Sequence, residues 1–140
     1  MSDKTPVVVT NVPQPVGPYS TAIQCENLLF ISGQLPVDPQ TGRLSGEDAA
    51  SQTRQILENI RAILDAVEMG LHRVTKTTLF LTDLEQFDAV NEVYAEYFKF
   101  EPPARSCVQV AALPKNARVM IEAIAVGPRR EANAKSKGFI

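Results

Sequence analysis

The sequence predicts an α+β fold in which two helices pack on one face of a single mixed β-sheet. Two observations predict this class. β-rich runs and amphipathic helical patterns alternate in the order β-β-α-β-α-β-β. The last run, RVMIEAIAV (118–126), has apolar residues on both faces when read as a strand, apart from Glu122. A strand of this kind is normally buried on both sides, so both faces of the sheet are expected to be covered.

Two short strands open the chain. The β-branched run VVVT (7–10) ends at a proline-rich loop that cannot continue as a helix. The segment NLLFIS predicts a second strand over about 28–32, because the turn residues DPQTG follow shortly after it. The first third of the chain therefore predicts strands and shaped loops.

Two amphipathic helices come next. Before the first, Ser45 and Asp48 resemble a capping pair, and apolar residues then recur at three-to-four spacing until Gly70, which is expected to end it. Before the second, Asp83 is the expected cap, and Pro102 follows its end. The apolar stripe of the second helix consists of Phe87, Val90, Tyr94, Tyr97 and Phe98.

Three more strands are predicted at 74–81, 105–113 and 117–126. The last two are joined by the short segment LPKN, which predicts an antiparallel hairpin. Two helices can cover only one face of such a sheet. The other face is expected to meet a second copy of the chain, so the sequence predicts a homo-oligomer.

The chain of 140 residues is predicted to form one domain over 1–127, followed by a basic tail at 128–140. The tail has four basic residues and one acidic residue, whereas the body is acidic. An acidic body is a poor match for a nucleic-acid backbone. The tail can contact RNA or an acidic surface, although a solvated terminus is the simpler interpretation.

Several chemistries find no support. The chain has no membrane-length apolar stretch, and its start lacks the apolar run of a secretion signal. Cys25 and Cys107 are widely spaced, and His72 is the single histidine. A cytoplasmic protein without a metal or a disulfide is therefore expected. Phosphate-binding and hydrolase motifs are absent, and Cys107 has no partner histidine in the sequence.

Three polar residues interrupt apolar patterns. Glu122 is expected to be buried, at a cost of several kcal/mol unless it is paired, although a structural ion pair or a wet edge position are alternatives. Arg105 opens a strand after two prolines, and its planar fork matches a carboxylate. Alternatively, Arg105 can form an ion pair with Glu101 or with Glu122. The predicted hairpin makes the strands of Arg105 and Glu122 neighbours, so these two side chains can lie close together. Asn91 lies on the inner helical stripe, where bonding to a loop backbone is the simpler role.

A loop–strand junction is the remaining candidate. ISGQ (31–34) offers backbone N–H groups beside the Ser32 hydroxyl, an arrangement that can cradle an oxyanion or a carboxylate. Tyr19 lies at a similar junction near glycine. Since Ser-Gly is a common turn, this pattern by itself is not specific.

Taken together, these residues resemble the RidA/YjgF family, also called the endoribonuclease L-PSP or reactive-intermediate deaminase family. The resemblance covers about residues 5–127. It is carried by GPYS (17–20), ISGQLPVDPQTG (31–42), TRQILENI (53–60), VTKTTLFLTDLEQFDAVNEVY (74–94), PPARSCVQVAALP (102–114) and IEAIAVG (121–127).

The resemblance implies a chorismate-mutase-like fold and a homotrimer with ligand clefts between subunits. It implies hydrolysis of 2-imino and enamine acids, such as 2-aminoacrylate and 2-iminobutanoate, to 2-keto acids and ammonia without a cofactor. Pyridoxal-phosphate-dependent dehydratases supply such substrates. The alternatives are a non-catalytic module that binds 2-keto acids or docks an enzyme, and an endoribonuclease or translation inhibitor, against which the acidic body and lone histidine argue.

The resemblance also assigns roles to residues of this chain. Arg105 matches the arginine that grips the substrate carboxylate, and Glu122 matches the glutamate that positions the hydrolytic water. Met120 stands where the family often has a second glutamate. The positions expected to line the cleft are Tyr19, Ser32, Gly33, Asn91 and Cys107, the last through its backbone.

Overall fold

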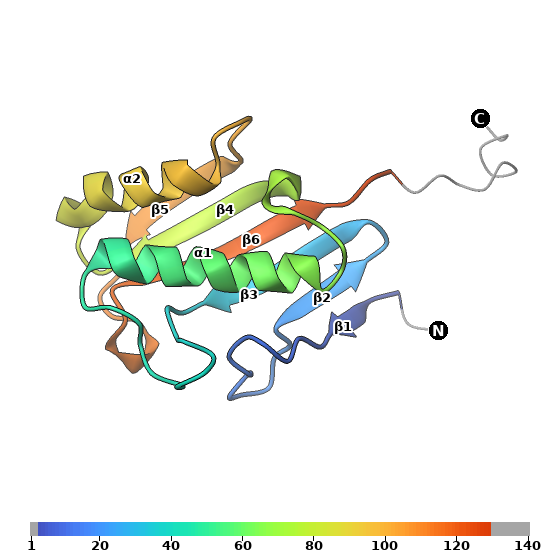
Figure 1. Ribbon diagram of the computed structural model, residues 1–140, viewed down its shortest axis with the longest axis horizontal. Helices are drawn as coiled ribbons and strands as arrows, with labels where there is room; N and C mark the ends of the chain where they lie inside the picture. Colours follow the sequence, from blue (N-terminus) through green and yellow to red (C-terminus); the bar gives the residue numbers. More distant parts are fainter. Residues whose placement is uncertain (1–2, 130–140) are drawn as a thin grey trace, which may run out of the picture.

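Six strands form one mixed sheet, which a computed structural model of the chain describes over residues 3–129. The order across the sheet is β1-β2-β3-β6-β4-β5 (Figure 1). All neighbours are antiparallel except β4 and β5, which are parallel. The strands are β1 (Thr5–Val7), β2 (Ala22–Cys25), β3 (Leu28–Gln34), β4 (Val74–Leu81), β5 (Ala104–Gln109) and β6 (Val119–Val126).

The predicted hairpin between the last two strands is wrong, because β4 lies between β5 and β6. β5 pairs with the outer side of β4, and the chain then passes the end of β4 to place β6 on its inner side. Backbone hydrogen bonds hold this passage, from Val110 N–H to Leu81 O and from Thr82 N–H to Arg118 O. β6 is apolar on both faces, but only its inner face is buried, because Met120, Ile124 and Val126 on the other face stay partly exposed. The expected burial of this strand on both sides is therefore wrong for a single chain.

The N-terminal strands also differ from their predictions. The first strand ends at Val7, and Val9 instead packs into the core from the following loop. β2 was not predicted, because its four residues AIQC include a glutamine and a cysteine and give no clear β-signal. The predicted second strand is present as β3 and extends to Gln34.

Helix α1 (Ala49–Asp65) begins at Asp48, whose side chain accepts a hydrogen bond from Ser51 N–H at 2.7 Å. Asp48 rather than Ser45 is therefore the cap, which corrects the predicted capping pair. The helix ends at Asp65, before Gly70, which begins the short 3₁₀ turn η1 (Leu71–Arg73). The fully buried stripe of α1 includes Ile56, Leu57, Ile60, Ile63 and Leu64.

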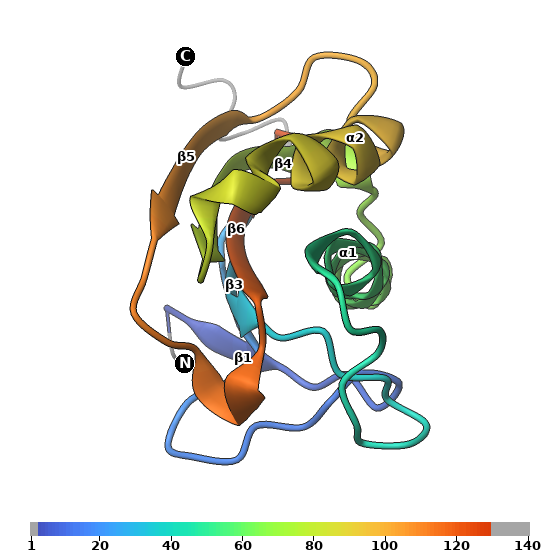
Figure 2. The ribbon, with the colours of Figure 1, turned by 90° about the vertical axis from the view of Figure 1, so that its left-hand side faces the viewer.

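Helix α2 (Phe87–Tyr97) follows the 3₁₀ turn η2 (Leu84–Gln86). Asp83, the predicted cap of this helix, instead caps η2 by accepting the Glu85 N–H, and α2 itself begins at Gln86 without a side-chain cap. A third 3₁₀ turn, η3 (Pro114–Asn116), precedes β6. Both helices lie on the same side of the sheet, so the predicted one-sided arrangement is confirmed (Figure 2).

The core lies between the helices and the sheet residues that face them. β6 contributes Val119, Ile121, Ala123 and Ala125 to this core. The opposite face, here called the open face, has no helix over it in the described chain (Figure 2). Its apolar side chains are all at least partly exposed: Ile23, Leu28, Phe30, Phe80, Val108, Met120, Ile124 and Val126.

None of the helices in residues 3–129 combines the length and the apolar character that crossing a membrane requires. Of the predicted basic tail at 128–140, only residues 128 and 129 belong to the described part of the chain.

Candidate active site

Arg105 lies against helix α2, on the helix-covered side of the sheet. Its guanidinium donates a hydrogen bond from Nη1 to Asn91 Oδ1 at 2.8 Å. The carbon Cζ lies 5.4 Å from the centre of the Phe87 ring and 4.9 Å from the centre of the Tyr94 ring. Both distances are within the range of a cation–π contact. We call Arg105, Asn91, Phe87, Tyr94 and Cys107 the arginine cluster.

The spacing of the α2 residues explains why they meet one side chain. Phe87, Asn91 and Tyr94 are four and three positions apart, so they form one stripe along the helix. The Tyr94 hydroxyl in turn contacts the buried Thr77 hydroxyl at 2.6 Å, which fixes the ring. Burial raises the pKa of Tyr94, against smaller opposing effects of the Thr77 hydrogen bond and the Arg105 charge. The phenol therefore stays neutral beneath the guanidinium.

Within residues 3–129, Arg105 forms no salt bridge, whereas Arg54 pairs with Glu96 and Arg61 pairs with Glu58. Neither Glu101 nor Glu122 is its partner, so both alternatives that the sequence offers for Arg105 are wrong in the single chain. Asn91 bonds Arg105 instead of the loop backbone that was the simpler prediction. One amide oxygen occupies one of the five N–H donors of a guanidinium, so the fork remains available to an anion.

Cys107 follows two residues later on the same face of β5, half-buried against the core. Burial raises the pKa of its thiol, and the nearby Arg105 charge lowers it by less. The thiol is therefore neutral near pH 7, which does not favour a nucleophilic role.

Glu122 lies on the open face and is exposed in the single chain. The expected burial of this carboxylate is therefore wrong for an isolated protomer. It lines a depression of about 310 Å³, the sheet hollow, together with Phe30, Ile31, Lys76, Thr78, Ala123 and Ile124. Within the described chain its carboxylate has no hydrogen-bond or ion-pair partner.

Ser32 and Gly33 lie across from Glu122 on the neighbouring strand. The β3–β6 register is irregular between Ile31 and Gln34, so these two residues form a bulge beside β6. The Ser32 hydroxyl donates to Ser20 O at 2.6 Å, which ties the bulge to the loop that carries Tyr19. A Cβ on Gly33 would lie 2.8 Å from the Met120 sulfur, so glycine leaves room for this methionine.

The predicted site residues thus form two groups in one chain. Arg105, Asn91 and Cys107 lie under α2, whereas Glu122 lies on the open face beside the bulge. The strand register explains this separation. Arg105 pairs with Thr77 of β4, and Glu122 pairs with Thr78. Because successive residues of β4 point to opposite faces of the sheet, Arg105 and Glu122 do so as well. The expectation that hairpin pairing brings Arg105 near Glu122 is wrong, since β4 separates their strands by two spacings of about 4.8 Å.

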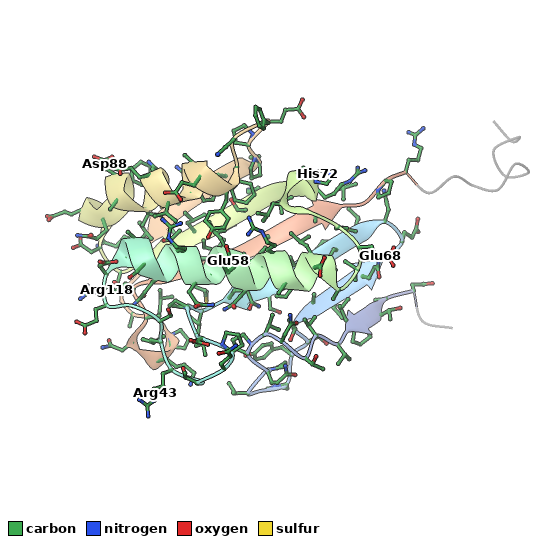
Figure 3. The ribbon with its side chains drawn as sticks, in the orientation of Figure 1. Arg43, Glu58, Glu68, His72, Asp88 and Arg118 are labelled. Carbon is green, nitrogen blue, oxygen red and sulfur yellow. The ribbon has the colours of Figure 1, made fainter. Side chains whose placement is uncertain are left out.

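The sequence pattern places Phe87 and Tyr94 on the apolar stripe of the second helix, and it does not predict their contact with Arg105. Their spacing from Asn91 was visible in the sequence, but the partner strand was not. His72 lies exposed on η1, between α1 and β4 (Figure 3). Within residues 3–129 no three His, Cys, Asp or Glu side chains gather as metal ligands would.

The fold and the site define a class: an α+β protein with helices on one side of a six-stranded sheet and a guanidinium that lacks an acidic partner in the described chain. The chain belongs to the endoribonuclease L-PSP family, whose model matches residues 9–127.

Relatives match over most of their length. A RutC family protein of Pyrococcus horikoshii is 51% identical over 122 residues, covering 87% of this chain and 97% of that protein. The mouse protein named 2-iminobutanoate/2-iminopropanoate deaminase is 44% identical over 123 residues, covering 87% and 91%. The crystal structure of Escherichia coli TdcF with bound serine aligns with a TM-score of 0.84 at 41% identity, covering 89% and 99%.

Proposed function

We propose that this protein hydrolyses reactive 2-imino and enamine acids, such as 2-iminobutanoate and 2-aminoacrylate, to 2-keto acids and ammonia. The observation that carries the proposal is the Arg105 guanidinium, which Asn91 and two aromatic rings hold without neutralising it. The name of the mouse relative supports this reaction, and the serine bound to TdcF is a small ligand with a carboxylate.

The active site of the proposal is shared between copies of the chain, with Arg105 from one protomer and Glu122 from another. The two groups point to opposite faces of one sheet, so one protomer cannot direct both at a small substrate. The apolar open face beside Glu122 is a surface that a second copy would cover. The homotrimer with clefts between subunits, which the family resemblance implies, meets this requirement.

In the proposed mechanism, Arg105 binds the substrate carboxylate and places the C=N carbon near Glu122. Glu122 accepts a proton from a water molecule while the oxygen of that water bonds to the C=N carbon, which leads to a carbinolamine. That first proton goes to the nitrogen to complete the carbinolamine. Glu122 then moves the proton of the new hydroxyl to the nitrogen, so the C–N bond breaks as the C=O bond forms, and ammonia leaves with a 2-keto acid. An imine carbon is already electrophilic, so positioning and one base are enough and the proposal requires no cofactor.

The source of the substrate follows from the same chemistry. Eliminating water from serine or threonine produces an enamine that isomerises to a 2-imino acid. Pyridoxal-phosphate-dependent dehydratases catalyse this elimination, so we place the protein downstream of such an enzyme.

The test generates 2-iminobutanoate from threonine with a dehydratase and follows its decay with and without the protein. Arg105→Ala is expected to lose turnover and binding of 2-oxobutanoate. Glu122→Gln is expected to lose about 10²-fold or more in turnover while it still binds 2-oxobutanoate. Arg43→Ala and Glu92→Gln remove matched exposed charges outside both groups and are expected to match the wild type. Wild-type imine hydrolysis by Glu122→Gln would rule out its role.

Mixing the two inactive variants tests whether the site is shared. If each cleft takes Arg105 from one protomer and Glu122 from another, random mixing restores roughly a quarter of the clefts. The chains are mixed by joint refolding, and mass spectrometry confirms that hybrid oligomers form. Hybrids without recovered activity would place both residues of each site in one chain.

The same assays distinguish the other functions considered. A non-catalytic module would bind 2-oxobutanoate without accelerating imine decay. An endoribonuclease would degrade RNA, and it would retain this activity in Arg105→Ala.

A further inference from the structure

The sheet hollow on the open face carries two opposite charges. Its lining contains one cation, Lys76, and one anion, Glu122, and its other members are uncharged: Phe30, Ile31, Thr78, Ala123 and Ile124. The hollow lies on the face of the sheet that the helices leave uncovered (Figure 2). Glu122 has a role in the proposed function, whereas Lys76 has none, although it lines the same hollow as the proposed base.

The register of strands β4 and β6 places Lys76 within reach of Glu122. Glu122 pairs with Thr78 and Lys76 pairs with Ile124, so Lys76 and Glu122 are diagonal neighbours in an antiparallel pair of strands. Diagonal neighbours on one face lie about 7–8 Å apart, a separation that a long side chain can span. A carboxylate and an ammonium group at these two positions can therefore form an ion pair.

An irregularity in β4 accompanies this placement. The β4–β6 register shifts between Val74 and Lys76, which indicates a bulge. In a regular strand these two residues would share one face, because they are two positions apart. Instead, Val74 is buried in the core, whereas Lys76 lines the sheet hollow. Bulges are frequent beside active sites, where they redirect a side chain.

Lys76 is the one cation among the sheet neighbours of Glu122 in the described chain. The strand residues around Glu122 are otherwise uncharged: Ser32, Thr78, Phe80, Met120 and Ile124. Glu122 is exposed and Lys76 is half-buried, and no ion pair joins them within residues 3–129. Such a pair contributes little while water solvates both groups. A second copy on the open face would remove that water, and the carboxylate would then require an opposite charge.

We propose that Lys76 is a positioning residue, whose ammonium group pairs with the Glu122 carboxylate in the assembled protein and holds it toward the bound imine. The inference rests on the proposed function and adds a residue to its site. The ammonium group offsets the charge of the carboxylate on a covered face that would otherwise disfavour it. Lys76 thus acts through Glu122, whereas Arg105 binds the substrate carboxylate.

The kinetic test replaces Lys76 by methionine, which removes the ammonium group and keeps most of the side-chain length. We expect kcat for 2-iminobutanoate to fall about tenfold or more, because general-base catalysis contributes roughly 10²- to 10⁴-fold and depends on the position of the base. The Kd for 2-oxobutanoate is expected to equal that of the wild type, since Arg105 is unchanged. Lys76→Arg keeps the charge, so its kcat is expected to exceed that of Lys76→Met.

Lys99→Met is the matched control, because Lys99 is an exposed lysine on the loop between α2 and β5. Its kcat and Kd are expected to equal those of the wild type. All variants are compared at protein concentrations where light scattering gives the same oligomer mass. A wild-type kcat in Lys76→Met, or an equal kcat in Lys76→Met and Lys76→Arg, would overturn the positioning role. A weaker Kd with an unchanged kcat would assign Lys76 to substrate binding and would overturn it as well.

A double-mutant cycle tests the ion pair without relying on catalysis. Lys76→Met leaves the Glu122 carboxylate without its partner, and Glu122→Gln leaves the Lys76 ammonium group without its own, so each is expected to lower the Tm of the oligomer. The double variant removes both charges, and its loss of Tm is expected to be smaller than the sum of the two single losses. Additive losses would overturn the pairing. If the wild type hydrolyses no imine while the cycle shows coupling, the proposed function fails and the ion pair stands, so the two failures are distinguishable.

Discussion

At the scale of single residues, the site depends on how Arg105 is held. Aromatic faces and one amide oxygen attract the guanidinium, yet none of them carries a negative charge. A cation–π contact contributes about 0.5–2 kcal/mol, and a hydrogen bond to a charged group about 1.5–3 kcal/mol. The side chain is therefore oriented without being neutralised. An acidic partner would orient it equally well, but it would compete with any anionic ligand for the guanidinium.

The thiol of Cys107 reports on this environment. Burial raises its pKa and Arg105 lowers it by less, so the thiolate forms above the ordinary value of about 8.5. Replacing Arg105 by methionine removes the charge and keeps most of the volume, so we expect the pKa to rise further. The thiolate absorbance of a Cys25→Ser variant, followed against pH, measures it. A lower pKa in Arg105→Met would contradict this account.

At the scale of elements, local signals place the helices and their ends. Three-to-four spacing predicted both helices, because residues that far apart share a face whatever the rest of the chain does. The sequence predicts Ser45 as the cap of α1, three residues before the observed cap, Asp48. Serine and aspartate are both good cap residues, so residue type does not distinguish them. The Ser51 N–H decides between them, and its position depends on where the first turn closes.

The Asp48 cap makes the stability of the fold depend on pH. Hydrogen bonds from the Ser51 side chain and backbone lower the pKa of Asp48. Its contribution is thus complete above the unfolded pKa of about 3.9 and is lost as pH falls through the lower folded pKa. We expect Asp48→Ala to lower the Tm at pH 7 and to match the wild type once pH is below that folded value.

Asp65→Ala is the matched control for this effect. It removes an exposed acid from the opposite end of the same helix, where a negative charge is unfavourable. Its Tm at pH 7 is expected to equal or exceed that of the wild type. Thermal unfolding by circular dichroism at several pH values compares the three proteins, and an equal loss in both variants would exclude a capping effect.

At the scale of the whole molecule, the open face is the feature that the described chain leaves without a covering layer. Eight partly exposed apolar residues line it, and Phe30 is 42% exposed beside Glu122. A continuous apolar surface of this kind is typical of an interface between proteins. A second protomer on this face would remove it from water.

Phe30→Glu places a charge in the middle of this face. We expect it to lower the oligomer mass measured by light scattering after size-exclusion chromatography, because burying an unpaired charge at an interface is strongly unfavourable. Phe100→Glu is the control: Phe100 is 86% exposed on the loop between α2 and β5, away from the sheet. Its mass is expected to equal that of the wild type. An unchanged mass in Phe30→Glu would argue against assembly through the open face.

The sequence by itself determined the fold class, both helices, four of the strands and the chemical identity of the candidate residues, because these depend on composition and on neighbours a few positions apart. Only the tertiary structure decided that β6 lies between β3 and β4, that β2 exists, and that Arg105 and Glu122 point to opposite faces. Strand pairing joins residues far apart in the chain, and a shift of one residue in register reverses the face of every side chain. The pairing of Arg105 with Thr77 and of Glu122 with Thr78 therefore decides whether one protomer or two can complete the site.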